Sequence, residues 1–299
     1  MTSDMQILTL SAGASRIEIW NIGARLNAAS WAGFDGLVDG SATVEDARGP
    51  KLNHGCVVGP VANRIAGSRF ELDGTTYRFP PNEGESTLCH SGDTSLRDRV
   101  WTVTAASDVS AVLTAEVDHM EDGFPGNRVF EAEYRVSDHG FDLRLSAETD
   151  APTLVNLALH PYWTLNGRGR AGQSLSVAAD HYLPIDGLKI PTGEIAPVDN
   201  TIFDLREIGV PSTEIDHNFC LSQKRAADAP AARLVAERGL ALEILTDAPG
   251  IQVFTGKEIG IALEPQHWPD APHHPAFPSI RLEPGARYEQ TTLYRFSKV

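Results

Sequence analysis

The most informative stretch of this chain is Gly260-Ile261-Ala262-Leu263-Glu264-Pro265-Gln266-His267-Trp268-Pro269-Asp270. It reads as an apolar strand that runs into one carboxylate and is expected to stop at the proline. Because side chains alternate along a strand, Ile261 and Leu263 share one face. Glu264 lies on the other face, where its neighbours are only a glycine and an alanine. A small-residue face with one carboxylate is typical of a pocket floor, and a buried glutamate needs a partner or a task.

The segment 155–160, Val-Asn-Leu-Ala-Leu-His, repeats this arrangement, again before a proline. Its aliphatic residues share one face, and Asn156, Ala158 and His160 share the other. Taken alone, His160 is better explained as a hydrogen-bonded structural histidine, and a structural salt bridge explains Glu264 equally well. The repeated arrangement favours a functional pair. Histidine titrates near pH 6.5 and a desolvated glutamate titrates above its usual range, so the two suit general acid–base catalysis.

Strand periodicity also dominates the rest of the chain. Apolar and polar residues alternate over 130–136 and 141–147, and less regularly over 111–118. Residues 70–79 predict a hairpin around Asp73-Gly74, a pair that tolerates positive φ. Only residues 226–237 show a pattern compatible with a helix. We therefore expect an all-β fold of packed antiparallel sheets, with residues 1–299 forming a single domain.

The composition narrows the class of function. Lysine and arginine number 25 against 40 acidic residues, which gives a net charge of −15 and argues against nucleic acid as a partner. The three cysteines, Cys56, Cys89 and Cys220, are an odd number without a CxxC motif and predict free thiols in a reducing compartment. No apolar run approaches the length of a membrane span, so we expect no membrane association and a cytoplasmic location.

Several further polar residues are candidates for a site. Asn63 and Arg64 come just before the predicted hairpin, and an arginine offers a fork of donors to an oxygen-rich ligand. A loop arginine in a salt bridge is the simpler explanation. His90 lies in a polar loop and is most simply a solvent-exposed histidine. Asp216 precedes an apolar run and is equally well explained by a turn or cap.

Metal and cofactor sites find little support in the sequence. His267, His273 and His274 cluster in a proline-rich segment, without the i, i+4 spacing of helical zinc sites. Cys89 beside His90 is no nucleophile–base pair, because adjacent residues usually point apart. No glycine-rich phosphate loop is present, so we expect neither a metal nor a nucleotide cofactor.

Seven or more short motifs, in order along nearly the whole chain, resemble the aldose 1-epimerase (galactose mutarotase) family. Each motif is weak alone, but their order is specific. They are Ala62-Asn63-Arg64-Ile65, the loop at His90, 156–163, 197–204, Asp216-His217-Asn218-Phe219, 250–256, 263–270 and the C-terminal segments 277–285 and 294–296.

The resemblance implies a β-supersandwich fold and interconversion of the α and β anomers of a free sugar such as galactose or glucose. By position, Glu264 corresponds to the general base and His160 to the general acid. The sugar-binding positions fall on Asn63, Arg64, His90, Asp216 and Gln252. The chain departs from the family pattern at Pro60, at Ser91-Gly92 and at Pro161-Tyr162-Trp163. None of these removes a catalytic group, although Trp163 and Trp268 could reshape the pocket and, like Phe254, could stack on a sugar.

Three alternatives stay open. A hexose-6-phosphate 1-epimerase would need a basic cluster at the pocket rim, for which Arg64, Arg97 and Arg99 are candidates. A non-catalytic sugar-binding module would not need both Glu264 and His160. A glycoside-cleaving enzyme would need two carboxylates around the bond, with Asp216 as the second.

Overall fold

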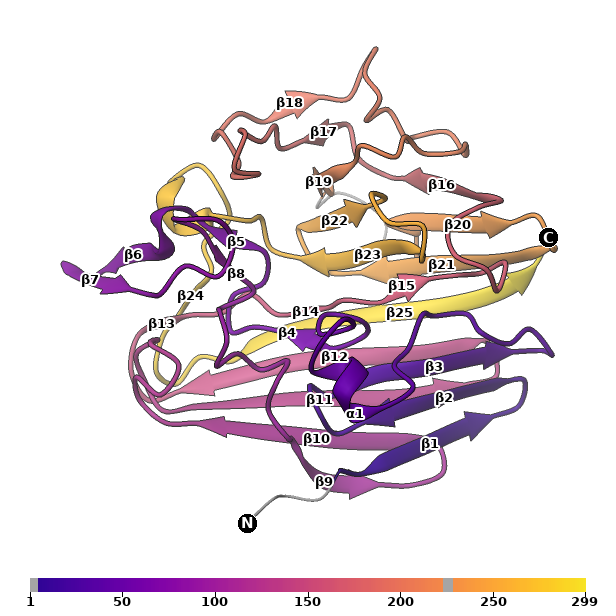
Figure 1. The fold of residues 1–299 in the computed structure, drawn as a ribbon, viewed down its shortest axis with the longest axis horizontal. Helices are drawn as coiled ribbons and strands as arrows, with labels where there is room; N and C mark the ends of the chain where they lie inside the picture. The colour runs from indigo at the N-terminus through magenta and orange to yellow at the C-terminus, as the bar shows by residue number, and fades with distance from the viewer. Residues whose placement is uncertain (1–4, 223–227) are drawn as a thin grey trace.

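Two antiparallel sheets carry most of the fold in the computed structural model, which describes residues 5–222 and 228–299 (Figure 1). The larger sheet has eight strands. In spatial order they are β16 (Gln173–Val177), β20 (Ala232–Ala236), β21 (Leu240–Thr246), β25 (Tyr288–Lys298), β12 (Gly140–Thr149), β11 (Arg128–Ser137), β10 (Ser110–Val117) and β9 (Thr102–Ala106).

The alternation of apolar and polar residues seen in the sequence accounts for strands β11 and β12 of this sheet. Phe130 and Tyr134 of β11 are fully buried, and their cross-strand partners Ala147 and Leu143 on β12 are almost fully buried. The two strands pair in unbroken register from Arg128 onward. The intervening polar residues are half-buried or exposed, so one face of the sheet meets the core and the other meets solvent. The predicted strands at 111–118, 130–136 and 141–147 are confirmed.

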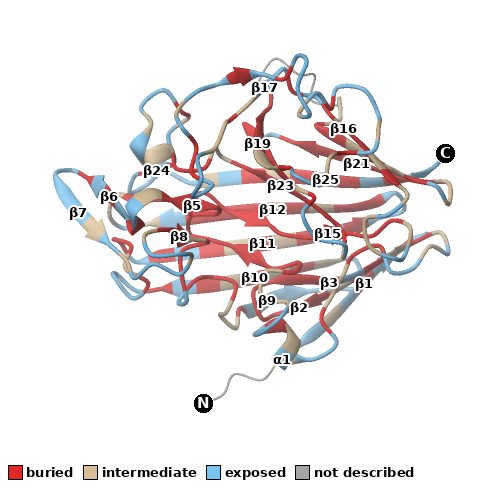
Figure 2. Ribbon diagram, turned by 45° about the horizontal axis from the view of Figure 1, so that its top comes forward, coloured by how far each residue is buried: buried red, intermediate tan, exposed pale blue. Residues whose placement is uncertain are grey.

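A three-stranded sheet closes one end of the core: β1 (Ile7–Ala12), β2 (Ser15–Trp20) and β3 (Arg25–Trp31). Its strands β1 and β2 contact β10, β11 and β12. The main hydrophobic core runs between these layers, with side chains from Leu10 near one end of the chain to Phe296 near the other. Figure 2 shows the buried residues concentrated along the inner strands.

A second sheet of six strands bears Asp216, Gln252 and Glu264, three of the seven predicted site residues. In spatial order it contains β15 (Tyr162–Trp163), β23 (Ile261–Gln266), β22 (Gly250–Phe254), β19 (Asp216–Cys220), β17 (His181–Tyr182) and β18 (Ala196–Pro197). Ile261 and Leu263 of β23 point into the main core, as predicted. The opposite face of the same strands is therefore free to form a site.

Short paired strands complete the fold. They are β4 (Val57–Val58) with β14 (Ala158–Leu159), β5 (Arg64–Ile65) with β8 (Leu88–Cys89), β6 (Arg69–Leu72) with β7 (Thr75–Arg78), and β13 (Thr153–Leu154) with β24 (Arg281–Leu282). The described residues also include the helix α1 (Val44–Ala47) and the 3-10 turns η1 (Ala66–Ser68) and η2 (Ala271–His273). The β6–β7 hairpin turns at Asp73 and Gly74, both with positive φ, which confirms that prediction.

Three expectations about local structure were wrong. The helix expected over 226–237 is instead strand β20 from Ala232 to Ala236, while Ala226 and Ala227 lie outside the described residues. In this strand, buried Ala232, Leu234 and Ala236 alternate with half-buried residues and pair with β21. The tertiary partner therefore overrides a weak local preference.

The other two corrections concern the strands at the site. Pro265 does not stop β23, which continues to Gln266. Because β15 pairs only with Ile261 and Ala262, Pro265 lies beyond its end and its missing N–H costs no ladder bond to β15. Residues 155–160 do not form one continuous strand: only Ala158–Leu159 is a paired strand, and Asn156 forms an isolated bridge to Val61.

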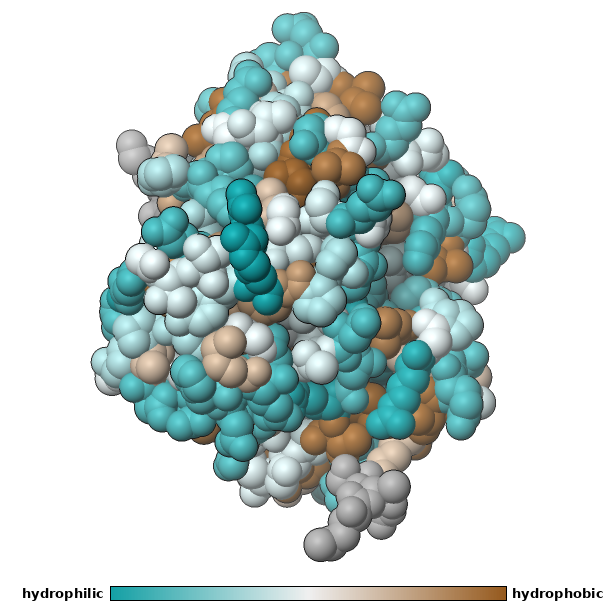
Figure 3. All heavy atoms as spheres, turned by 60° about the vertical axis from the view of Figure 1, so that its left-hand side comes forward, coloured by the Kyte–Doolittle hydropathy of each residue, from teal (hydrophilic) through white to brown (hydrophobic). Residues whose placement is uncertain are grey.

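The outer surface is predominantly polar on the face seen in Figure 3, with hydrophobic side chains in small separate patches. Among the described residues, no helix is both long enough and apolar enough to cross a membrane.

A buried ion pair at one end of the large sheet predicts a measurable stability effect. The guanidinium of Arg128 donates two hydrogen bonds to the Asp122 carboxylate, at 2.7 and 3.0 Å, and both side chains are almost fully buried. Removing one partner leaves the other charge buried and alone, so Asp122→Ala should lower the free energy of unfolding by about 3 kcal/mol. Urea unfolding of the variant and the unmodified protein measures this loss.

The matched control is the ion pair of Arg135 with Glu133, in which the arginine is largely exposed. Arg135→Gln should cost under about 1 kcal/mol. Equal losses of unfolding free energy in Asp122→Ala and Arg135→Gln would contradict this distinction between buried and exposed ion pairs.

Candidate active site

Glu264 lies on β23, the second strand from one edge of the second sheet. Its strand β23 is flanked by β15 and β22, and Gln252 of β22 is its direct cross-strand partner. The side chain is only 2% exposed. It shares its face with Ala262, as predicted, and the small alanine leaves room above the sheet beside the carboxylate.

His160 reaches Glu264 from the short chain segment that follows β14. Its backbone N–H donates to the carbonyl of Cys56 at 3.0 Å, and its own carbonyl accepts from Gly55 at 2.8 Å. These bonds fix the residue although it lies outside a regular strand. The imidazole Nε2 lies 3.4 Å from Oε1 of Glu264, and both groups are buried. The structure thus brings together the two residues that the sequence singled out.

Asn63 and His90 form the next part of the cluster. The backbone N–H of Asn63 donates to Nδ1 of His90 at 3.1 Å, and the backbone N–H of His90 donates to the carbonyl of Asn63 at 2.8 Å. The neutral His90 ring therefore carries its proton on Nε2. This ring lies edge-on to His160, with centroids 5.3 Å apart. His90 is buried, so the expectation of an exposed loop histidine was wrong.

Asp216 connects the remaining predicted residues. Its Oδ1 accepts a hydrogen bond from Nε2 of Gln252 at 2.9 Å, and its Oδ2 lies 3.6 Å from the guanidinium of Arg64. Arg64 is held in turn by Glu83, to which it donates from Nε and at 2.9 Å from Nη2. All seven residues predicted from the sequence therefore lie in one connected cluster. Four of them lie on strands β5, β19, β22 and β23, while Asn63 precedes β5, His90 follows β8 and His160 follows β14.

Left-handed backbone conformations occur where this cluster is built. Asn63, His90 and Ser91 have φ of 62°, 50° and 62°. Such conformations cost free energy in residues other than glycine, and they persist where surrounding contacts impose them. Here the hydroxyl of Ser91 donates to the carbonyl and accepts from the N–H of Val61, which ties the two loops together.

Burial disfavours charge on both central groups. It raises the pKa of Glu264 well above its usual range, and the nearby Asp216 carboxylate raises it further, while Arg64 acts in the opposite direction. Burial also lowers the pKa of His160. Two buried groups 3.4 Å apart titrate as a unit, and burial favours the arrangement in which both are neutral.

Several polar atoms of the cluster are left for a ligand. In the described part of the chain, Oε2 of Glu264, Nδ1 of His160 and Oε1 of Gln252 are buried without a hydrogen-bond partner. An unmade hydrogen bond at a buried polar atom costs about 1–3 kcal/mol. Their concentration in one place indicates a binding site.

Sequence reasoning missed one aromatic residue of the site and misplaced another. Tyr162 pairs with Ala262 and so shares the face of Glu264; its ring lies 5.1 Å from that of His160 and 6.3 Å from that of Phe254. Trp163, offered as a stacking residue, is fully buried in the main core against Tyr294. Strand alternation could have separated these neighbours had β15 been recognised.

A small cavity opens beside the cluster, lined by Asn63, Leu183, Ile185, Lys189, Pro191, Asp216, Asn218, Gln252 and Pro269. Three of the predicted residues contribute to it. Lys189 was not anticipated from the sequence, because nothing in its local pattern places it near Asp216.

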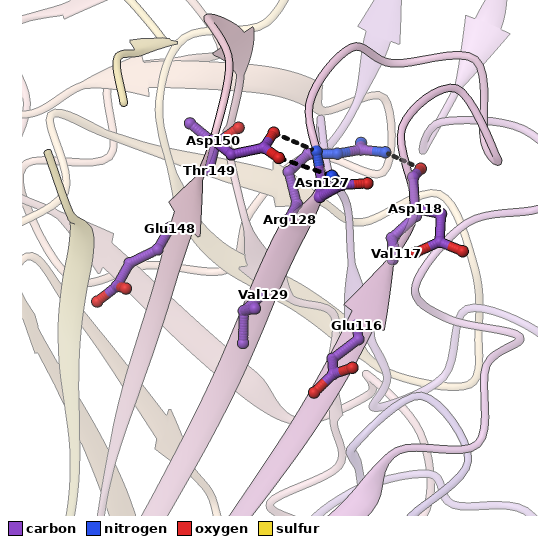
Figure 4. Close-up of a pocket in the computed structure, with 9 residues that line it drawn as sticks. All are labelled: Glu116, Val117, Asp118, Asn127, Arg128, Val129, Glu148, Thr149 and Asp150. Atoms are coloured by element: carbon purple, nitrogen blue, oxygen red, sulfur yellow. Dashed lines mark hydrogen bonds between the residues drawn. The ribbon is translucent and has the colours of Figure 1, made fainter. Parts of the chain in front are cut away.

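A separate hollow lies at the ends of β10, β11 and β12, as Figure 4 shows. Its acidic residues include Glu116, Glu148 and Asp150, and both carboxylate oxygens of Asp150 already accept hydrogen bonds from Asn127.

The described residues contain no group of three or more side chains arranged to hold a metal ion. His273 and His274 instead lie against the Asp270 carboxylate.

Comparison with known proteins gives the family of this chain. A family model for aldose 1-epimerase matches residues 6–295. Galactose mutarotase from Rattus norvegicus is 36% identical over 288 residues, covering 87% of this chain and 84% of that protein. The chain belongs to the aldose 1-epimerase family. Aldose 1-epimerase from Escherichia coli (strain K12) is 31% identical over 275 residues, covering 81% of this chain and 79% of that protein.

Solved structures place the fold in the same family. A crystal structure of an aldose epimerase homologue from C. elegans matches with a TM-score of 0.93 at 27% identity, covering 99% of this chain and all of that one. The galactose mutarotase-like β-supersandwich expected for an aldose 1-epimerase is thus confirmed.

The burial of Glu264 in this aldose 1-epimerase predicts a pH-dependent stability effect. A carboxyl group whose pKa is raised by folding binds its proton more tightly in the folded state, so its contribution to stability falls as pH rises above the unfolded pKa. Glu264→Gln removes that contribution. The free energy of unfolding of the variant, relative to the unmodified protein, should therefore increase between pH 4.5 and pH 8.

Urea titrations across this range measure the difference, and Glu116→Gln, at an exposed glutamate of β10, is the control. A difference for Glu264→Gln that stays constant with pH would contradict the raised pKa.

Proposed function

We propose that this protein is an aldose 1-epimerase (mutarotase), an isomerase that interconverts the α and β anomers of a free aldose such as galactose or glucose. The observation that carries the proposal is the buried contact of 3.4 Å between His160 and Glu264, surrounded by polar side chains with free hydrogen-bonding atoms. Its identity of 36% with a galactose mutarotase supports the same reaction class.

Glu264 and His160 supply the two proton transfers that ring opening requires. The C1 hydroxyl must lose a proton while the ring oxygen gains one. Glu264 takes the first proton as general base, and His160 donates the second as general acid. The open-chain aldehyde then turns about the bond between C1 and C2. Reclosure with the roles reversed gives the other anomer, so no step needs a nucleophile, a metal or a redox cofactor.

The protonation state of the pair fits this cycle. One proton shared between Glu264 and His160 is all that the reaction needs, provided that it lies on His160 when the sugar reacts. Burial favours the neutral arrangement in the free protein. Hydrogen bonds from the sugar hydroxyl to Oε2 of Glu264 would favour the ionised carboxylate. Each turnover returns both protons, so the pair ends as it began.

The five other predicted residues would hold the sugar. Asp216 and the carbonyl of Gln252 accept hydrogen bonds, while Arg64, Nε2 of His90 and the amide of Asn63 donate them. Tyr162 and Phe254 would cover an apolar face of the ring. Fixing the substrate in this way contributes to the rate because the reacting groups are already in place.

The geometry does not favour a sugar phosphate as substrate. Arg97 is buried and donates to Asn53 and to the carbonyl of Gly92, and Arg99 pairs with Glu121. Arg64 is engaged by Glu83 and Asp216. The three arginines considered for a phosphate are thus held by partners of their own. A free sugar fits better.

We also propose that residues 1–299 act as one domain in a reducing, cytoplasmic compartment. The main core joins residues from Leu10 to Phe296, which supports a single unit. Cys56, Cys89 and Cys220 are all free thiols, which supports a reducing environment.

Replacement of the base tests the mechanism. Glu264→Gln keeps the size of the side chain but cannot take the C1 hydroxyl proton, so kcat should fall by about 10²–10⁴-fold. Polarimetry on freshly dissolved α-galactose measures the rate, and Glu116→Gln should remain fully active. An active Glu264→Gln enzyme would remove the base assignment.

Replacement of the acid should act similarly. His160→Asn should lower kcat by about 10²–10⁴-fold. In the unmodified enzyme, kcat/KM should follow a bell-shaped pH profile. Its alkaline limb, where the pair loses its shared proton, should lie well above the usual titration range of a glutamate, because burial raises the pKa of Glu264. A loss of kcat/KM as pH rises through about 4.5, the range of an ordinary glutamate, or a His160→Asn variant of normal activity, would count against the pair.

A further inference from the structure

The loop between β17 and β18 carries a lysine into the proposed sugar site. The turn at residues 186–190 is fastened by Asp186, whose Oδ1 accepts hydrogen bonds from the backbone N–H of Leu188 at 2.8 Å and of Ile190 at 3.0 Å. The backbone N–H of Lys189 donates to the carbonyl of Asp186 at 3.0 Å. Lys189 itself has a φ of 63°, a left-handed conformation that is costly for a lysine.

This conformation places the lysine against Asp216. The Lys189 ammonium lies 3.0 Å from Oδ2 of Asp216, while Gln252 occupies Oδ1 of the same carboxylate. Lys189, Asp216 and Gln252 all line the cavity beside the catalytic cluster, together with Asn63. The lysine is therefore part of the cavity wall as well as one partner of an ion pair.

We propose that Lys189 is a specificity-determining residue that, together with Asp216, binds two neighbouring hydroxyls of the sugar at carbons 3 and 4. The inference rests on the proposed function, because it takes Glu264 and His160 to hold the C1 end. An ammonium offers three donors and a carboxylate offers several acceptor sites. Side by side, they match a vicinal diol, in which one hydroxyl accepts from the lysine and the other donates to the aspartate.

The placement of the pair agrees with an end of the sugar remote from C1. Asp216 is on β19, and β22 separates that strand from β23, which carries Glu264. Two strand spacings amount to roughly 10 Å between the backbones. A sugar ring with C1 at Glu264 would therefore present its far hydroxyls to Asp216 and Lys189.

An ordinary surface salt bridge is the competing explanation, since Lys189 is half-exposed. Such a pair contributes little to stability. It would also respond equally to every sugar, whereas a diol-binding lysine would respond to the presence of particular hydroxyls. The substrate dependence of a variant therefore separates the two explanations.

The experiment compares Lys189→Met with the unmodified enzyme on galactose, 3-deoxygalactose and 4-deoxygalactose. Anomerisation is followed by polarimetry or by NMR. Lys189→Met keeps an unbranched side chain but removes the charge. We expect kcat/KM for galactose to fall about 10- to 100-fold, mainly through KM, as for loss of a hydrogen bond to a charged group. The unmodified enzyme should discriminate against both deoxy sugars, and the variant should lose most of this discrimination for one of them.

Two further variants complete the test. Lys189→Arg keeps a cation and should retain the discrimination in part, while Lys298→Met, at an exposed lysine near the end of β25, should behave as the unmodified enzyme. Circular dichroism confirms folding; if Lys189→Met did not fold, Lys189→Gln would carry the same comparison.

Equal effects of Lys189→Met on all three sugars, or no effect on galactose, would overturn the inference while leaving the proposed function intact. If the unmodified enzyme accelerated anomerisation of no aldose, the proposed function itself would fail.

Discussion

The active site depends on the contact between His160 and Glu264. Burial disfavours the charged form of each of these groups. His160 and Glu264 lie 3.4 Å apart and almost fully enclosed. Either charge alone would be costly at this depth, but one proton shared between them leaves the pair neutral in both of its arrangements. The protein thereby keeps an acid and a base together in a site from which water is largely excluded, where proton transfer to a bound sugar needs little rearrangement.

Backbone hydrogen bonds hold both residues of this contact in place. Glu264 is at the centre of β23, whose other face packs Ile261 and Leu263 into the main core. His160 is fixed by backbone hydrogen bonds on both sides of its peptide. A site built in this way on sheet elements is more precise than one built on free loops. The loops contribute at the rim, where Asn63, His90 and Lys189 all adopt left-handed backbone conformations.

Much of this could be predicted from sequence, for physical reasons. Alternation along a strand places Glu264 and Leu263 on opposite faces of β23. The same rule holds for long strands that are paired on both sides, such as β11 and β12. The roles of Asn63 and His90 came only from the ordered motifs, because their own surroundings look like ordinary loops. The hydrogen bond between these two residues joins positions 27 apart, which no local pattern encodes.

The errors also have physical causes. Pro265 was expected to end β23, but a proline is tolerated where the strand has outrun its neighbour β15. A helix was expected over 226–237, although pairing with β21 makes Ala232–Ala236 a strand. Trp163 was placed in the site although alternation along β15 turns it into the core and turns Tyr162 outward. In each case the missing information was a strand partner distant in sequence.

The most direct test of the central claim is NMR exchange spectroscopy of galactose at anomeric equilibrium in D₂O with the purified protein. Ring opening by paired proton transfer moves only protons bound to oxygen. The account therefore predicts accelerated exchange between the α and β signals, with the protons on C1 and C2 fully retained. Exchange no faster than in buffer alone, or exchange accompanied by deuterium at C1 or C2, would contradict it.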